Sequence, residues 1–207
     1  MSTTNKKIAV VGAGPVGALL CCYLSKYGYE IDLYEGRSDI RSDKNAGGNS
    51  INLSLSERGR NALRGVNLEN YVVGLGTKMT GRMIHQNTKN GDCFSVPYGT
   101  TDQHYLLSVN RLLLNKEMIT LAERCKNVSL HFSHKLVSSN LKENILEFKT
   151  PDGPKTSEKY DFVFGCDGIW SNVRRQQMRE GKVNFSQTYI THSYKELILP
   201  AKSKRVS

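Results

Sequence analysis

The chain has 207 residues, 38% of them hydrophobic, and no apolar run approaches the roughly 20 residues of a transmembrane span. Its 29 basic and 19 acidic residues give a net charge of +10. Because the basic residues are scattered and form no stripe interleaved with aromatics, the composition argues against a nucleic-acid groove. A net positive charge would attract anionic nucleotides and substrates, and this role is sufficient to account for the excess of basic residues.

A glycine-rich turn follows the first predicted strand, residues 8–11. Gly12, Gly14 and Gly17 have the G-x-G-x-x-G spacing directly after this apolar run, and a helix with Pro15 near its first turn comes next. This spacing predicts a tight turn at Gly12, close approach of the backbone to a pyrophosphate at Gly14, and close helix–strand packing at Gly17. The start of the helix would offer free N–H groups to the phosphates.

A second strand, residues 30–34, is predicted to end at Glu35. This carboxylate lies roughly 20 residues beyond the last glycine, where a dinucleotide fold places the acid that binds a ribose hydroxyl. Strand, glycine turn, helix, second strand and acid together predict a nucleotide-binding βαβ unit. They leave open whether the nucleotide is NAD or FAD.

The middle of the chain mixes helical and strand patterns. Ser54 and Glu57 form an S-x-x-E capping box for a short helix. Residues 82–107 are short strand-like pieces broken by NGD and PYG, which predicts β structure inserted between the halves of the nucleotide fold. A second long helix is predicted over residues 112–124, with Asn110 as its cap.

Several strands follow, and the last of them, within YDFVFG, leads into GCDGIWSNVR. If residues 160–164 join the sheet of the first strand, both glycine corners open toward one crevice. We therefore expect residues 165–168 to lie beside residues 12–17. His131 and His134 are predicted to point to opposite faces of a strand, so no metal site is expected from them.

The setting is predicted from the cysteines and the start of the chain. Five cysteines without a C-x-x-C pair are typical of reduced thiols in an intracellular protein. The polar start MSTTNKK does not have the pattern of a signal peptide. The chain by itself is expected to be soluble and cytoplasmic.

The order GAGPVG, YEGR, SINLSLSERGR, RMIH, PYGT, LSVNR and GCDGIWSNVR resembles the FAD-dependent aromatic hydroxylases, and within them the branch that acts on L-kynurenine. The resemblance covers nearly the whole chain. It implies a truncated α/β, Rossmann-like FAD-binding fold with a parallel sheet and inserted β-strands of a substrate region. Residues 1–81 and 105–180 would form the FAD-binding domain, and residues 82–104 and 181–207 would be partial substrate-domain β segments.

The resemblance also implies site residues. Arg82 and Tyr98 match the family's substrate contacts, and a guanidinium can bind the carboxylate of a kynurenine bidentately while a phenol adds a directed hydrogen bond. Asp167 and Arg174 belong to an element that serves both FAD and NADPH. The predicted cofactor-binding residues are Gly12, Gly14, Val16, Gly17, Tyr34, Glu35, Gly36, Arg37, Ser54, Arg111, Leu136, Asp167, Gly168 and Arg174.

The implied reaction is hydroxylation of L-kynurenine to 3-hydroxykynurenine with NADPH and O2, in tryptophan degradation toward NAD synthesis. The cofactor carries the chemistry, so no catalytic nucleophile or metal is expected in the protein. The family acts at the cytosolic face of the mitochondrial outer membrane, held there by a C-terminal region that has no counterpart in this sequence.

The chain stops roughly midway through a typical hydroxylase, before the later Gly-Asp element that closes over the flavin. We therefore expect weak FAD binding and no hydroxylation from these residues alone. A fragment, a truncated gene model and a shortened isoform all stay open. So do two other classes: an NAD-dependent Rossmann dehydrogenase, and a non-catalytic protein that binds other chains through an exposed apolar sheet surface.

Overall fold

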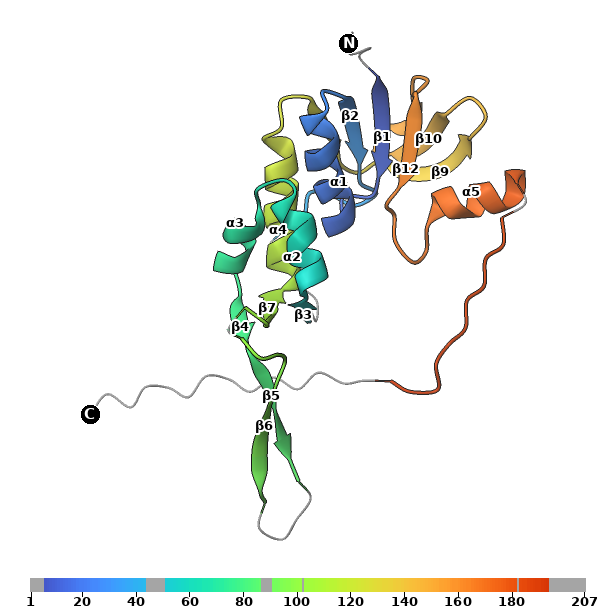
Figure 1. Ribbon diagram of the computed structural model, residues 1–207. Helices are drawn as coiled ribbons and strands as arrows, with labels where there is room; N and C mark the ends of the chain where they lie inside the picture. The colour runs from blue at the N-terminus through green and yellow to red at the C-terminus, as the bar shows by residue number, and fades with distance from the viewer. Residues whose placement is uncertain (1–5, 44–50, 87–90, 102, 182, 194–207) are drawn as a thin grey trace.

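The fold is centred on a parallel β-sheet (Figure 1). The computed structural model describes residues 6–43, 51–86, 91–101, 103–181 and 183–193. The sheet has four parallel strands in the order β12 (Phe162–Gly165), β1 (Lys7–Val11), β2 (Glu30–Tyr34) and β8 (Val128–His131). The predicted pairing of β1 with β12 is confirmed, because Val11 lies in register with Gly165.

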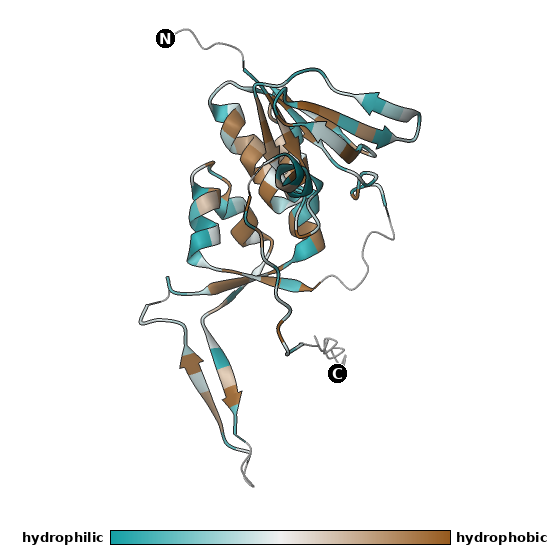
Figure 2. Cartoon of the chain, turned by 90° about the vertical axis from the view of Figure 1, so that its right-hand side faces the viewer, coloured by the Kyte–Doolittle hydropathy of each residue, from teal (hydrophilic) through white to brown (hydrophobic). Residues whose placement is uncertain are grey.

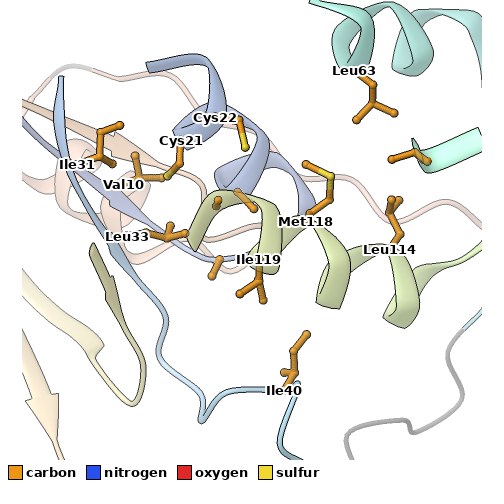
Figure 3. Packing of buried hydrophobic residues seen from close by; sticks show 14 of the residues in the cluster. Val10, Cys21, Cys22, Ile31, Leu33, Ile40, Leu63, Leu114, Met118 and Ile119 are labelled. Atoms are coloured by element: carbon orange, nitrogen blue, oxygen red, sulfur yellow. The ribbon is translucent and has the colours of Figure 1, made fainter. Parts of the chain in front are cut away.

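Two helices, α1 (Pro15–Lys26) and α4 (Arg111–Glu123), cover one face of this sheet. Figure 3 shows side chains of β1 and β2 pointing toward Cys21 of α1 and Ile119 of α4. Pro15 starts α1, and the Asn110 side chain caps α4 by accepting the N–H of Leu113 at 2.9 Å. Figure 2 shows hydrophobic residues concentrated in this central part.

The opposite face packs against a second, antiparallel sheet. Its strands are β11 (Gly153–Thr156), β10 (Ile145–Thr150) and β9 (Lys135–Asn140), and the helix α5 (Asn172–Glu180) packs beside β9. A separate apolar cluster fills this side; it contains Ala9, Val11, Tyr34, Leu136, Leu146, Phe148, Tyr160 and Val173. The central strands β1 and β2 are therefore covered on both faces, as is usual for parallel sheets.

The inserted region carries the remaining elements. A three-stranded antiparallel sheet has the order β3 (Asn52–Leu55), β7 (Leu106–Asn110) and β4 (Thr77–Met79), and the helices α2 (Glu57–Arg64) and α3 (Glu69–Gly74) pack against each other next to it. The hairpin of β5 (Gly81–His85) and β6 (Cys93–Pro97) projects away from the body (Figure 1). The expected β insertion is thus confirmed. Of the range 181–207, also predicted to be β segments, residue 181 and residues 183–193 form no strand, and the rest lies outside the described residues.

Two local predictions were wrong. Ser54 does not cap α2, because it lies in β3 opposite Ser108, and Ser56 occupies the N-cap position. His131 and His134 do not point to opposite faces, because β8 ends at His131 and the chain turns at Ser133, whose φ is 57°. Their rings lie 5.6 Å apart. Among the described residues, no helix combines the length and apolar character of a membrane span.

Candidate nucleotide-binding site

A cavity of about 490 Å³ opens at the carboxyl ends of the parallel strands. This is the edge at which open α/β sheets bind ligands. The cavity is lined by Val11, Gly12, Gly14, Tyr34, Glu35, Gly36, Arg37, Arg111, His134, Lys135, Leu136, Cys166, Asp167, Gly168, Ile169, Trp170 and Asn172.

The two glycine corners meet at one side of this cavity. The N–H of Cys166 donates to the carbonyl oxygen of Val11 at 2.7 Å, and the N–H of Gly12 donates to the carbonyl oxygen of Tyr34 at 2.7 Å. Gly12 has a φ of +106°, and a Cβ at this position would lie 2.5 Å from the carbonyl oxygen of Cys166. Only glycine fits here, as its place in the fingerprint predicted.

The other two fingerprint glycines have different surroundings. A Cβ on Gly17 would collide with the carbonyl oxygen of Gly12, so this glycine permits close packing of α1 against the turn. A Cβ on Gly14 would meet no atom within 4 Å and would project into open space beside the cavity. Because Gly14 is also the N-cap of α1 and has no side chain, the N–H groups at the start of this helix stay open to an anionic ligand.

Glu35 is a buried carboxylate at the edge of the cavity. It accepts hydrogen bonds from the N–H of Ala13 at 3.1 Å, and from the N–H and Nε of Arg37 at 3.0 and 2.9 Å. Burial alone would raise the pKa of Glu35, but the hydrogen bonds and the charge of Arg37 outweigh it and hold the pKa below its usual value. Glu35 is therefore ionised at neutral pH and keeps lone pairs for a ligand hydroxyl.

Asp167 has a structural role at the late corner. Its carboxylate accepts hydrogen bonds from Oγ of Ser171 at 2.5 Å, from the N–H of Asn172 at 2.6 Å and from the N–H of Val173 at 3.3 Å. These contacts satisfy backbone donors at the start of α5. Asp167 thus holds this helix on the corner and is also one of the residues that line the cavity.

The predicted cofactor-binding residues do not all gather in this cavity. Val16 and Arg174 line an adjoining cavity of about 410 Å³, which shares Cys166 and Gly168 with the first. The guanidinium of Arg174 donates to the carbonyl oxygens of Gly168 and Ile169. Ser54 lies in β3 and lines neither cavity. Gly17 also lines neither cavity, because it packs against the backbone of Gly12.

The two predicted substrate residues lie on the projecting hairpin and its end. Arg82 is directly opposite Val96 in the hairpin. Tyr98 follows the end of β6 at the base of the hairpin, where its N–H donates to the carbonyl oxygen of Thr80 at 2.9 Å. Tyr98 also lines a third cavity, of about 910 Å³, together with Arg60, Lys78 and Tyr105. Arg82 lines neither this cavity nor the one at the sheet edge.

Seven residues that line the cavity were not among the predicted cofactor-binding residues: Val11, His134, Lys135, Cys166, Ile169, Trp170 and Asn172. His134 and Lys135 line the cavity just before Leu136, and Asn172 joins α5 to β9 by donating from Nδ2 to the carbonyl oxygen of Leu136 at 2.8 Å. The Nδ1 atom of His134 lies 2.7 Å from the carbonyl oxygen of Phe132, so it carries the proton. No sequence motif marked His134, Lys135 or Asn172, because His134 lies between β8 and β9, Lys135 starts β9 and Asn172 starts α5.

The sequence matches the FAD binding domain family over residues 5–198, and the chain belongs to this family. The finding selects FAD, rather than NAD, as the nucleotide of the fingerprint. The fold is similar to that of p-nitrophenol 4-monooxygenase PnpA from Pseudomonas putida, with a TM-score of 0.66 and 19% identity over 83% of this chain and 44% of that chain.

Curated relatives narrow the class and confirm the resemblance to the kynurenine-hydroxylating branch. Kynurenine 3-monooxygenase from Anopheles gambiae is 45% identical over 194 residues, which cover 93% of this chain and 40% of that protein. The enzyme of the same name from Sus scrofa is 41% identical over 193 residues, with the same two shares. The chain thus spans about 40% of the length of these relatives.

Proposed function

We propose that this chain forms the FAD-binding part of an enzyme that hydroxylates L-kynurenine to 3-hydroxykynurenine with NADPH and O2. The observation that carries the proposal is the meeting of both glycine corners, Glu35 and two arginines around one cavity. The identity to kynurenine 3-monooxygenases supports the choice of reaction and substrate.

The described residues fit FAD in both shape and chemistry. Open space beside Gly14 lets a pyrophosphate approach the backbone at the start of α1. Glu35 is placed to accept a hydrogen bond from a ribose hydroxyl, as acids at this position do in dinucleotide folds. The guanidinium groups of Arg37 and Arg111 add positive charge at the cavity.

FAD, when bound, would supply the redox chemistry, with NADPH as its electron donor and O2 as the oxidant. The protein then has to bind the cofactor, orient the substrate and exclude water. In our proposal Arg82 of β5 pairs with the carboxylate of kynurenine, and Tyr98 at the base of the same hairpin adds a hydrogen bond. No side chain of this chain is proposed as a nucleophile.

We propose the same domain division as the sequence suggested: residues 1–81 and 105–180 for the cofactor, and residues 82–104 and 181–207 for the substrate side. The projection of the β5–β6 hairpin from the body supports the first of these boundaries (Figure 1). A role in tryptophan degradation toward NAD synthesis and a location at the mitochondrial outer membrane are proposed from the resemblance alone.

Titration of the purified chain with FAD, followed by flavin fluorescence and absorption, tests the cofactor site. We expect saturable binding that Gly14→Val abolishes without a change in circular dichroism, because the side chain would occupy the space for the pyrophosphate. Gly74→Val is the matched control, since Gly74 is equally open but lies in α3, away from the cavity. Equal FAD binding by wild type and Gly14→Val would refute this site.

A further inference from the structure

The strand β12 has two exposed large apolar side chains, whereas β1, β2 and β8 of the main sheet have none. In β12, Phe162 is 47% and Phe164 is 38% exposed. Their neighbours in the register of β1 are Ile8 and Val10, which are 2% and 0% exposed. Parallel strands are normally buried on both faces, so two half-exposed phenylalanines on such a strand indicate a missing cover.

The register identifies the side that lacks this cover. Phe162 and Phe164 pair with Ile8 and Val10, which face α1 and α4, so both phenylalanines project on the helical face of the sheet. Val163 projects on the other face, where it packs against the cluster beneath the β9–β11 sheet. The helical layer therefore covers β1 and β2 but leaves β12 open.

Chain topology indicates what belongs beside β12. The connection from β1 through α1 to β2 crosses the helical face toward β2. α5 follows β12 but packs on the opposite face, where its Val173 joins the second cluster. Because parallel crossovers are right-handed, a crossover on this opposite face runs in the opposite direction, so the next strand of the sheet lies on the free edge of β12.

Among the described residues, β12 pairs only with β1, so this edge has no strand beside it. The curated relatives contain more than the chain spans, and this remaining part is long enough to supply the strand. We propose that the free edge of β12, with Phe162 and Phe164, is a docking surface for a parallel strand and its apolar flank from a polypeptide that corresponds to this remaining part of the relatives.

The chemistry of the partner follows from the surface. Backbone N–H and C=O groups of β12 would give the strand its ladder, as in other cases of strand addition. Apolar side chains of the partner would cover the two phenylalanine rings. The Nζ atom of Lys6 lies 5.1 Å from the centroid of the Phe162 ring, so an acidic residue at this rim of the partner would be favourable.

Co-expression of the chain with a tagged polypeptide tests the surface. The probe is the part of Anopheles gambiae kynurenine 3-monooxygenase that lies beyond the region matched by this chain. We expect the chain to co-purify with the probe, and Phe162→Asp with Phe164→Asp to reduce the recovered complex at least tenfold. Tyr27→Asp is the matched control, since Tyr27 is 69% exposed at the end of α1, and it should leave recovery unchanged.

A second experiment covers the case in which the separate probe does not fold. The chain and the probe are joined in one polypeptide, and hydrogen exchange of the β12 amides is compared with that of the chain alone. Slower exchange in the fusion, lost in the double aspartate variant, supports the proposal. Unchanged exchange in β12 would overturn it, and so would a dimer of the chain alone that the same variant disrupts, because the occupant would then be a second copy. Neither readout depends on FAD.

Discussion

The carboxylate of Asp167 accepts the backbone N–H of Asn172 at 2.6 Å, so the late glycine corner and α5 form one unit. Asp167→Asn removes the negative charge next to the start of α5 and leaves one side-chain oxygen to accept from three donors. We predict a loss of about 1 to 2 kcal/mol in the free energy of unfolding, measured by urea titration. Asp152→Asn, on an exposed turn, is the control and should change the stability by less than about 0.5 kcal/mol.

Gly12 and Gly28 provide a second matched pair, because both have positive φ angles, +106° and +78°. A Cβ on Gly28 meets no atom within 4 Å, whereas a Cβ on Gly12 would press against the carbonyl of Cys166. We predict that Gly28→Ala costs about 1 kcal/mol of backbone strain and that Gly12→Ala costs clearly more. Equal shifts in the denaturation midpoint would show that the contact between the two corners is not tight.

The stability should depend on pH through Asp32. Burial alone would raise the pKa of this carboxyl, but hydrogen bonds from His131 and Tyr160, each 2.7 Å long, hold the pKa below its usual value. A lowered pKa stabilises the fold above the unfolded-state pKa of about 3.9, and this contribution is lost as the pH falls through the folded-state pKa. In urea unfolding from about pH 5 to about pH 3, the wild type should therefore lose more stability than Asp32→Asn. Parallel curves would contradict the prediction.

We predict that the 207 residues alone form no 3-hydroxykynurenine. Neither Arg82 nor Tyr98 lines the cavity at the sheet edge, and a hydroxylation site has to bring cofactor and substrate together away from water. Incubation with FAD, NADPH, O2 and kynurenine, followed by product chromatography, measures this. Formation of 3-hydroxykynurenine would show that the chain contains a complete site.

The role of Arg82 can be measured in the chain extended by the remaining part of a relative. There, Arg82→Met should weaken kynurenine binding by about 1.5 to 3 kcal/mol, because a charge-assisted hydrogen-bonded pair is lost, and should leave FAD binding intact. Lys155→Met, on the exposed strand β11, should leave kynurenine binding unchanged. If kynurenine titrates the Arg82 variant like the wild type, Arg82 does not bind its carboxylate.

The sequence by itself determined the features that depend on nearby residues. The glycine spacing, Pro15 and the acid at Glu35 defined β1, α1 and β2, because turn geometry, helix entry and strand length are local properties. The cap at Asn110 was equally local, since its side chain reaches a backbone N–H only three residues away. The family resemblance then supplied the cofactor.

Only the tertiary structure decided the features that depend on how elements pack. Ser54 had the spacing of a cap, but pairing with β7 drew it into a strand. The late corner beside Gly12 was predicted, whereas the use of the Asp167 carboxylate to hold α5 was not, because it required the position of that helix. The exposure of Phe162 and Phe164 could likewise not be predicted from the apolar run YDFVF, because the burial of a strand depends on which elements cover it.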